Sequence, residues 1–191
     1  MSDFRNYLKT SIAVLAAMES GDEFRRVEQA ADIIFAALAA DKPLLICGNG
    51  GSASDSMHIA GELVGRFLKE RRALKAIALC ADPAILTAWG NDYSYDDVFA
   101  RQVHAYGEAG GVLLAISTSG HSKNVIAAVE AANSKAMKTI ALTGKGGGTL
   151  AAMVDLLLAV PSSATPLIQQ AHICVYHYLC AEIEARIAAQ Q

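Results

Sequence analysis

Hydrophobic and polar residues follow two different patterns along the chain. Toward the N-terminus, apolar residues recur every three or four positions in two segments rich in alanine and leucine, which predicts amphipathic helices. Further along, short unbroken apolar runs alternate with helical segments, and such runs are typical of strands buried on both faces of a parallel sheet. The pattern predicts helices over residues 4–19, 22–40, 52–69, 83–89, 95–107, 120–133 and 166–188, and strands over 44–47, 76–79, 112–117, 138–143 and 154–160.

Strands that alternate with helices favour an α/β fold with right-handed crossovers. We expect a three-layer α/β/α sandwich around a five-stranded parallel sheet. A length of 191 residues fits one domain, with two extra helices over 1–40 and the α/β core with its C-terminal helix over 41–191. Ligands of such folds bind outside the carboxyl ends of the strands. The loops that follow the first four predicted strands are 48–52, 81–92, 117–122 and 144–148.

Composition narrows the classes of partner. The 16 basic and 19 acidic side chains give a formal net charge of −3, which offers no basic patch for nucleic acid. Hydrophobic residues make up 53% and charged residues 18%, so we expect surplus apolar surface to meet another subunit. The longest segment without charged side chains, 156–181, is interrupted by prolines, glutamines and histidines, which argues against a membrane span.

The N-terminus and the cysteines both favour a cytoplasmic protein. The first residues lack the basic start and the separate apolar core of a signal peptide. The four cysteines form no CxxC pair, and we interpret them as buried thiols in a reducing compartment. They are Cys47, Cys80, Cys174 and Cys180.

A glycine-rich segment, GNGGSA over 48–53, follows the first predicted strand and opens a helix. It fits the dinucleotide fingerprint GxGxxG/A, but that site needs an acidic residue about 20 residues on. Asp82 lies about 30 residues past the loop, so the spacing counts against a nicotinamide cofactor. A tight turn that packs a helix on the sheet is a second interpretation. The third, a backbone cradle for an oxygen-rich ligand, is favoured by the glycines and the Ser52 hydroxyl.

A second glycine-rich segment, GKGGG over 144–148, resembles a Walker A loop only in composition. No serine or threonine follows Lys145, and the glycine spacing is wrong. We interpret the segment as a flexible turn between a strand and a helix.

Hydroxyl groups are concentrated in the segment STSGHS over 117–122, which follows the third predicted strand. Four hydroxyls, backbone N–H groups and the N-terminus of the next helix meet there. The helix end carries partial positive charge and hydroxyls donate hydrogen bonds, so the segment predicts a phosphate site. Simple N-capping by Ser119 accounts for one hydroxyl but not for four.

Histidine, glutamate and glutamine gather on two predicted helices. His58 and Glu62 are four residues apart, so they share a helix face and can reach one metal ion, one substrate or only solvent. The last helix is apolar around most of its girth yet carries Gln169, His172 and His177. A helix that is apolar all round is buried, and buried polar groups must be hydrogen-bonded or ligated. Each histidine is also compatible with a satisfied core position.

Helix geometry limits which of these side chains can meet. Gln169 and His177 are eight residues apart, about 12 Å of rise along a straight helix. Three arrangements would bring both to one ion. The two side chains could lean toward each other, or the helix could kink. Alternatively, the site could be shared between subunits, with the last helix packed against a neighbour's His58–Glu62 helix.

Five segments together resemble the phosphoheptose isomerases, the sedoheptulose 7-phosphate isomerases of the SIS fold. The likeness covers nearly the whole chain, and the combination is far more specific than STSG alone. It implies a single SIS domain over 1–191, a five-stranded parallel sheet between helices, and a homotetramer. The segments are CGNGGSASDSMHIAGELVGRF, WGNDYSYDDVF, LLAISTSGHSKNVIAAVEAA, LTGKGGG and LIQQAHICVYHYLCAEIE.

The resemblance implies an activity and a set of site residues. The activity is conversion of D-sedoheptulose 7-phosphate to D-glycero-D-manno-heptose 7-phosphate through an enediol, for the heptose of lipopolysaccharide or other surface glycans. Glu62 and His177 would be the acid–base pair, because a carboxylate suits the carbon proton and an imidazole titrates near neutral pH. One zinc ion per subunit would be held by His58, Glu62, Gln169 and His177. The substrate contacts would be Asn49, Gly50, Gly51, Ser52, Glu62, Asn91, Asp92, Ser117, Thr118, Ser119, Ser122 and Gln169.

One departure and two rival functions remain. The family usually reads RIQE where this chain reads LIQQ over 167–170, so two charges are lost beside the site. The main rival is a non-catalytic SIS-fold tetramer that binds a partner protein such as the replication initiator. Such proteins lack the glutamate and the last histidine, whereas Glu62 and His177 are both present here. The second rival, a sugar-phosphate-sensing regulator, would need a DNA-binding module, which we do not expect.

Overall fold

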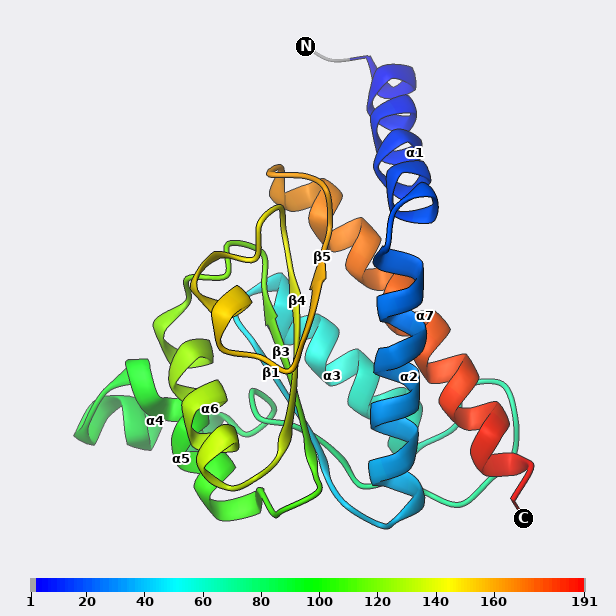
Figure 1. The fold of residues 1–191 in the computed structure, drawn as a ribbon. Coiled ribbons are helices and arrows are strands. Elements are labelled where there is room, and N and C mark those ends of the chain that lie inside the picture. Colours follow the sequence, from blue (N-terminus) through cyan, green and yellow to red (C-terminus); the bar gives the residue numbers. More distant parts are fainter. Residues whose placement is uncertain (1–2, 191) are drawn as a thin grey trace.

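The computed structural model describes residues 3–190, in which helices surround one five-stranded sheet (Figure 1). In chain order the elements are α1 (Phe4–Ser20), α2 (Glu23–Ala39), β1 (Leu44–Gly48), α3 (Gly51–Val64), β2 (Ala76–Ala78), α4 (Pro83–Asp92), the 3₁₀ helix η1 (Tyr95–Asp97), α5 (Val98–Tyr106), β3 (Val112–Ser117), α6 (Lys123–Ser134), β4 (Lys138–Thr143), the 3₁₀ helix η2 (Gly148–Ala152), β5 (Leu156–Ala159) and α7 (Thr165–Ala188).

The sheet is parallel throughout, with strand order β2-β1-β3-β4-β5. Leu45 of β1 lies in register with Ile77 on one side and Leu113 on the other. All residues of β1 and β3 are buried, as the unbroken apolar runs predict. The five-stranded parallel sheet and the α/β class are therefore confirmed.

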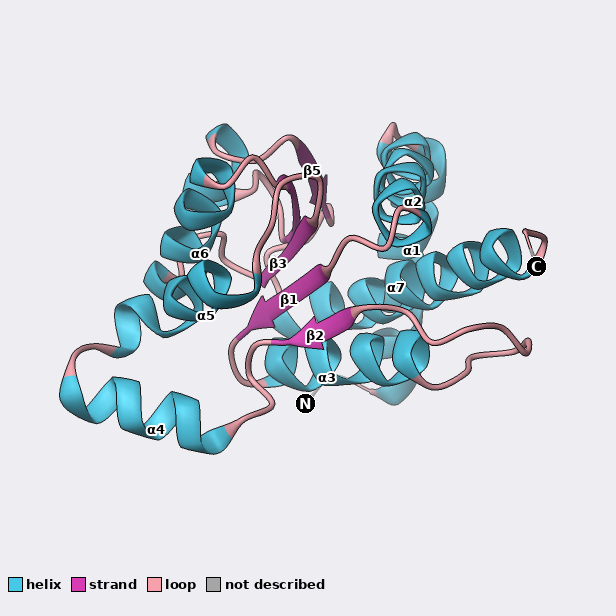
Figure 2. Cartoon of the chain, turned by 90° about the horizontal axis from the view of Figure 1, so that it is seen from below, coloured by secondary structure: helices cyan, strands magenta, loops and turns pink. Residues whose placement is uncertain are grey.

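Helices cover both faces of the sheet and complete the three layers (Figure 2). Successive side chains of a strand point to opposite faces. Leu44 and Ile46 therefore pack in a cluster with α2, α3 and α7, whereas Leu45 and Cys47 pack in a cluster with α5 and α6. Helix α1 extends beyond the sheet (Figure 1), and none of its residues is buried.

The strand order predicts a ligand site at the carboxyl ends of β1 and β3. The chain leaves β1 for β2 at one edge and returns to β3 on the other side of β1. After β1 it enters α3 on one face, and after β3 it enters α6 on the opposite face. A crevice opens outside the carboxyl ends of the strands where connections diverge in this way. The loops over 49–50 and 118–122 flank that position.

Several predicted boundaries are wrong by a few residues. The helix predicted over 52–69 ends at Val64, because the backbone that follows is held by a distant side chain described below. Helix α6 begins at Lys123 rather than residue 120, where glycine adopts a positive φ of 69°. The last strand is limited to Leu156–Ala159.

The cysteines match the prediction only in part. All four are free thiols, but Cys174 on α7 is exposed and Cys80, just after β2, is half-buried. Burial raises the pKa of the Cys180 thiol to about 12. Among residues 3–190, no helix combines the length and the apolar character that crossing a membrane requires.

Candidate active site

The glycine loop joins the end of β1 to α3 and lies against the last helix. Gly51 begins α3, and a Cβ atom at this position would overlap the side-chain amide of Gln169 on α7. With no side chain at Gly51, the Gln169 amide can lie directly against the backbone there. Gln169 therefore lies at the glycine loop.

The serine loop after β3 presents hydroxyls and a helix N-terminus together. Ser122 is the N-cap of α6, but its side chain makes no capping hydrogen bond. Its hydroxyl lies 2.9 Å from that of Ser117, while the N–H of His121 donates to Ser119 at 3.2 Å. The first turn of a helix leaves backbone N–H groups without helical acceptors. The N-capping alternative through Ser119 is therefore wrong, and the predicted phosphate site retains its donors.

The second glycine-rich loop, over 144–148, and the residues after it hold the serine loop by backbone hydrogen bonds. The N–H of Gly144 donates to Thr118 at 3.0 Å, and the N–H of Leu150 donates to Gly120 at 3.2 Å. Gly120 has a φ of 69°, and a Cβ atom there would overlap the carbonyl of Gly147. The segment leads into the 3₁₀ helix η2, so it is a turn held by hydrogen bonds rather than the flexible turn that its composition predicts.

Two asparagine side chains connect the loops across the crevice. Asn49 donates to Asn124 at 2.8 Å, and Asn124 donates back to Asn49 at 2.9 Å. The hydroxyl of Tyr95 also donates to Asn49, at 3.0 Å. A side-chain amide has two N–H donors and one oxygen, so Asn49 keeps one N–H for a ligand. The sequence analysis missed Asn124 and Tyr95, which lie 75 and 46 residues from Asn49.

Asn91 and Asp92 lie apart from these loops at the C-terminal end of α4. Their side chains are exposed, and Asn91 donates to Asp92 at 2.9 Å. Helix α4 projects beside α5 (Figure 2), and none of its residues is buried. The structure does not bring this pair into contact with the glycine or serine loops.

Helix α3 presents a polar face to α7. Gly51, Asp55, His58 and Glu62 recur at the spacing of one helix face. His58 Nε2 lies 3.0 Å from Glu62 Oε1, which confirms that the two side chains meet. Their side chains are 45% and 23% exposed, so a ligand can reach both.

A tyrosine and an aspartate support His58 from behind. The buried Tyr176 hydroxyl lies 3.1 Å from His58 Nδ1 and donates to Asp55 at 3.4 Å. The Tyr176 hydroxyl therefore links His58 to the Asp55 carboxylate. Burial raises the pKa of Asp55, although the Tyr176 hydrogen bond and nearby His58 act in the opposite direction. Asp55 shares the face of His58, and this spacing was the signal that the sequence analysis overlooked.

His177 joins the same cluster within one chain. Its ring centroid lies 5.1 Å from that of His58, and Phe67 stacks on it at 5.7 Å. Helix α7 therefore packs on its own chain's α3, and Glu62 and His177 need no second chain to approach each other.

Gln169 and His177 do not converge, as their separation along the helix predicts. Gln169 lies at Gly51 and His177 lies at His58, which is seven residues further along α3. The predicted zinc ligands are therefore divided between two places. Among the described residues, no group of three or more His, Cys, Asp or Glu side chains is arranged to hold a metal ion.

His172 is a core histidine. Its ring is fully buried, and Nε2 lies 3.1 Å from the carbonyl of Thr143 at the end of β4. Burial lowers the pKa of this imidazole to about 4 despite that hydrogen bond, so the ring is neutral at physiological pH. It attaches α7 to the sheet and takes no part in the polar cluster.

Comparison with known proteins gives the family of the chain. A family model described as the SIS domain matches residues 6–144. A phosphoheptose isomerase from Rhodospirillum rubrum is 51% identical over 164 residues, which cover 86% of this chain and 87% of the relative. The chain belongs to the phosphoheptose isomerase family of SIS-domain proteins.

Solved structures of the phosphoheptose isomerase family share the whole fold. The structure from Neisseria gonorrhoeae has a TM-score of 0.89 at 44% identity and covers 95% of this chain and 97% of its own. The structure from Francisella tularensis has a TM-score of 0.92 at 38% identity, with 95% and 96% coverage. Members of this family are isomerases, which does not favour the non-catalytic binding protein or the regulator.

The serine loop makes the phosphate site testable. Replacing Ser119 and Ser122 by alanine removes two hydroxyl donors of about 1 kcal/mol each, so we expect KM for a sugar phosphate to rise roughly 30-fold. The melting temperature should stay within experimental error of the parent. Ser134→Ala at the far end of α6 is the matched control and should leave KM unchanged. An unchanged KM in the double variant would place the phosphate elsewhere.

Proposed function

We propose that this chain is an aldose–ketose isomerase that converts D-sedoheptulose 7-phosphate to D-glycero-D-manno-heptose 7-phosphate, a heptose precursor of lipopolysaccharide or other surface glycans. The observation that carries the proposal is the approach of Glu62 and His177 around His58, on the facing sides of α3 and α7. The family's name and the coverage of almost the whole chain by its members support it.

The reaction transfers protons between C1 and C2 of the sugar. Glu62 takes a proton from C1, and the electrons of that bond form the C1–C2 double bond of an enediol while O2 gains a proton. The O1 proton then leaves, a proton is delivered to C2, and C1 becomes the aldehyde. A carboxylate suits the carbon proton, and the His177 imidazole suits the exchange between O1 and O2.

The remaining predicted contacts hold the substrate. The serine loop binds the phosphate through Ser117, Thr118, Ser119 and Ser122. Asn49, Gly50, Gly51, Ser52 and Gln169 bind the sugar at the glycine loop. The N-terminus of α6 adds partial positive charge, which favours a phosphate dianion.

The Glu62 role has a direct test. Glu62→Gln keeps the size of the side chain and removes its basicity, so we expect kcat to fall at least ~100-fold. Aldose phosphate formed from sedoheptulose 7-phosphate is the readout. Glu70→Gln, in the loop after α3, changes an exposed glutamate in the same way and should retain kcat. Parent-like turnover by Glu62→Gln would remove Glu62 from the mechanism, and no turnover by the parent would reject the substrate.

We also propose that zinc binds at His58, Glu62 and His177, whose side chains would have to move closer together to hold it, because they are not arranged as a metal site among the described residues. Imidazole nitrogen and carboxylate oxygen are donors that Zn²⁺ takes in catalytic sites. His58 Nε2 lies 3.0 Å from Glu62 Oε1, so a nitrogen donor and an oxygen donor already lie side by side. Gln169 does not complete the set within one chain. A bound zinc ion would stabilise negative charge on substrate oxygens.

Metal content tests the zinc proposal without an activity assay. We expect about one zinc per chain in purified protein, because three nitrogen and oxygen donors and one open position suit a catalytic zinc. His58→Ala should lose most of this metal, as measured by elemental mass spectrometry. His104→Ala, on α5, is the control and should retain it. Equal zinc content in both variants would contradict the assignment.

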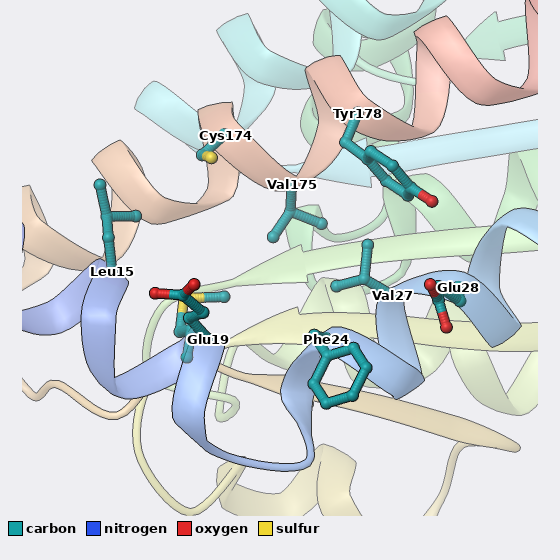
Figure 3. A pocket seen from close by; sticks show the side chains of 9 residues that line it. Leu15, Glu19, Phe24, Val27, Glu28, Cys174, Val175 and Tyr178 are labelled. Atoms are coloured by element: carbon teal, nitrogen blue, oxygen red, sulfur yellow. The ribbon is translucent and has the colours of Figure 1, made fainter.

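Assembly into a homotetramer is supported by uncovered apolar surface. On α1, Phe4, Leu8, Ile12 and Leu15 form one stripe and are between 39% and 71% exposed. An apolar groove of about 340 Å³ continues the stripe where α1 and α2 meet α7 (Figure 3). Its lining includes Leu15, Met18, Phe24, Val27, Cys174, Val175 and Tyr178.

Light scattering tests this assembly. We expect the native mass to equal four 20.1 kDa chains. Leu8→Glu with Ile12→Glu places two charges on the stripe, and the cost of burying them should reduce the mass to smaller species. Asn6→Glu with Thr10→Glu adds the same charges at the same spacing off the stripe and should keep the parent mass. A monomeric parent would contradict the proposal. We also propose a cytoplasmic location, which the free thiols support.

A further inference from the structure

A buried carboxylate organises the loop over 65–75, which connects α3 to β2. Glu184 lies on α7 and is 1% exposed. It accepts hydrogen bonds from the backbone N–H groups of Phe67 at 2.9 Å, Leu68 at 2.5 Å and Lys69 at 2.8 Å. These N–H groups would continue α3 if the helix ran on. The carboxylate therefore takes over the donors that a longer helix would use.

An equally buried guanidinium completes the arrangement. The Arg71 side chain is 0% exposed and lies 3.5 Å from Glu184. It donates to the carbonyls of Glu62 and Gly65, both at 2.7 Å. These carbonyls belong to the C-terminal end of α3, where a cation is favourable because the helix dipole is negative there. The pair thus fixes the loop and caps the helix that carries Glu62.

The loop that this pair holds contacts the candidate acid–base residues. The Phe67 ring is stacked on His177, with centroids 5.7 Å apart and planes at 29°. The backbone N–H of the same Phe67 is bonded to Glu184. Glu184 lies seven residues, about two helical turns, beyond His177 on α7. One helix therefore carries both His177 and the carboxylate that places the ring against it.

Stability alone does not account for a buried ion pair at this position. Removing two charges from water is costly, and apolar side chains of similar volume are often as stabilising. The pair instead specifies one backbone path, since three N–H donors and two carbonyls each have a fixed partner. Burial raises the pKa of Glu184, but the three N–H donors and Arg71 outweigh it and hold the pKa below its ordinary value.

We propose that Glu184 and Arg71 are positioning residues that seat Phe67 against His177 and fix the end of α3 that carries Glu62. The proposal rests on the proposed function, which assigns proton transfer to Glu62 and His177. Neither positioning residue touches the substrate. Their effect reaches the reaction only through the placement of the acid–base pair.

Kinetics of Glu184→Gln test the effect on proton transfer. The amide keeps the size of the side chain but leaves the buried Arg71 without its counter-charge, so the loop shifts. A displacement of about 1 Å at a catalytic group costs up to 10²-fold, so we expect kcat to fall 10- to 100-fold. KM should change less than about twofold, because the serine loop that binds the phosphate follows β3 and is not held by Glu184. Glu182→Gln on the same helix contacts Arg186 and should retain kcat.

An NMR measurement decides the positioning role without substrate. In protein with ¹³C-labelled histidine, Glu184→Gln should shift the imidazole C–H signals of His177, because the Phe67 ring leaves its stacking position. The signals of His104 and His121, outside the cluster, should remain in place. Unmoved His177 signals together with parent-like kcat would overturn the proposal. If the parent itself fails to isomerise sedoheptulose 7-phosphate, the proposed function fails, and this measurement still shows whether Glu184 positions Phe67 against His177.

A second pair of variants covers the case in which Glu184→Gln does not fold. Phe67→Leu keeps both buried charges and all backbone donors but removes the ring. It should move the His177 signals and lower kcat, and Phe67→Tyr, which keeps the ring, should restore both. Parent-like signals and kcat in Phe67→Leu would overturn the proposal.

Discussion

The side-by-side packing of α3 and α7 is the constraint on which the candidate site depends. The two helices run in the same direction, so contacts recur in order along them, from Gly51 with Gln169 to His58 with His177. The absence of a side chain at Gly51 allows the first contact. Each later contact then has its register set, because both helices are rigid and rise by the same amount per residue.

This packing connects two regions with different chemistry. The N-terminus of α3 faces the crevice at the carboxyl ends of the strands, where the glycine and serine loops are joined by Asn49 and Asn124. About two turns further along, the imidazole of His58 meets both the carboxylate of Glu62 and the ring of His177. A substrate that is phosphorylated at one end and reactive at the other matches this separation.

The sequence predicted what depends on near neighbours. The strands were predictable because each is an apolar run, and the meeting of His58 with Glu62 follows from helix spacing. The end of α3 was not predictable from the sequence, because Glu184, which holds the following loop, lies more than 110 residues away. The bond between Asn49 and Asn124 was hidden for the same reason. Interactions across the fold have no signature in local periodicity.

Helix α1 is less stabilised by packing than the rest of the chain. None of its residues is buried, and a hydrogen bond from Gln170 to Tyr7 is one of few ties to the body. Isolated helices of this length are marginal in water, because most helical stability in proteins comes from packing. The core can fold as a unimolecular event, whereas ordering of the first helix depends on what covers its stripe. In the proposed homotetramer, the helicity of α1 is therefore coupled to assembly, and dilution would expose this helix to proteases before the core is affected.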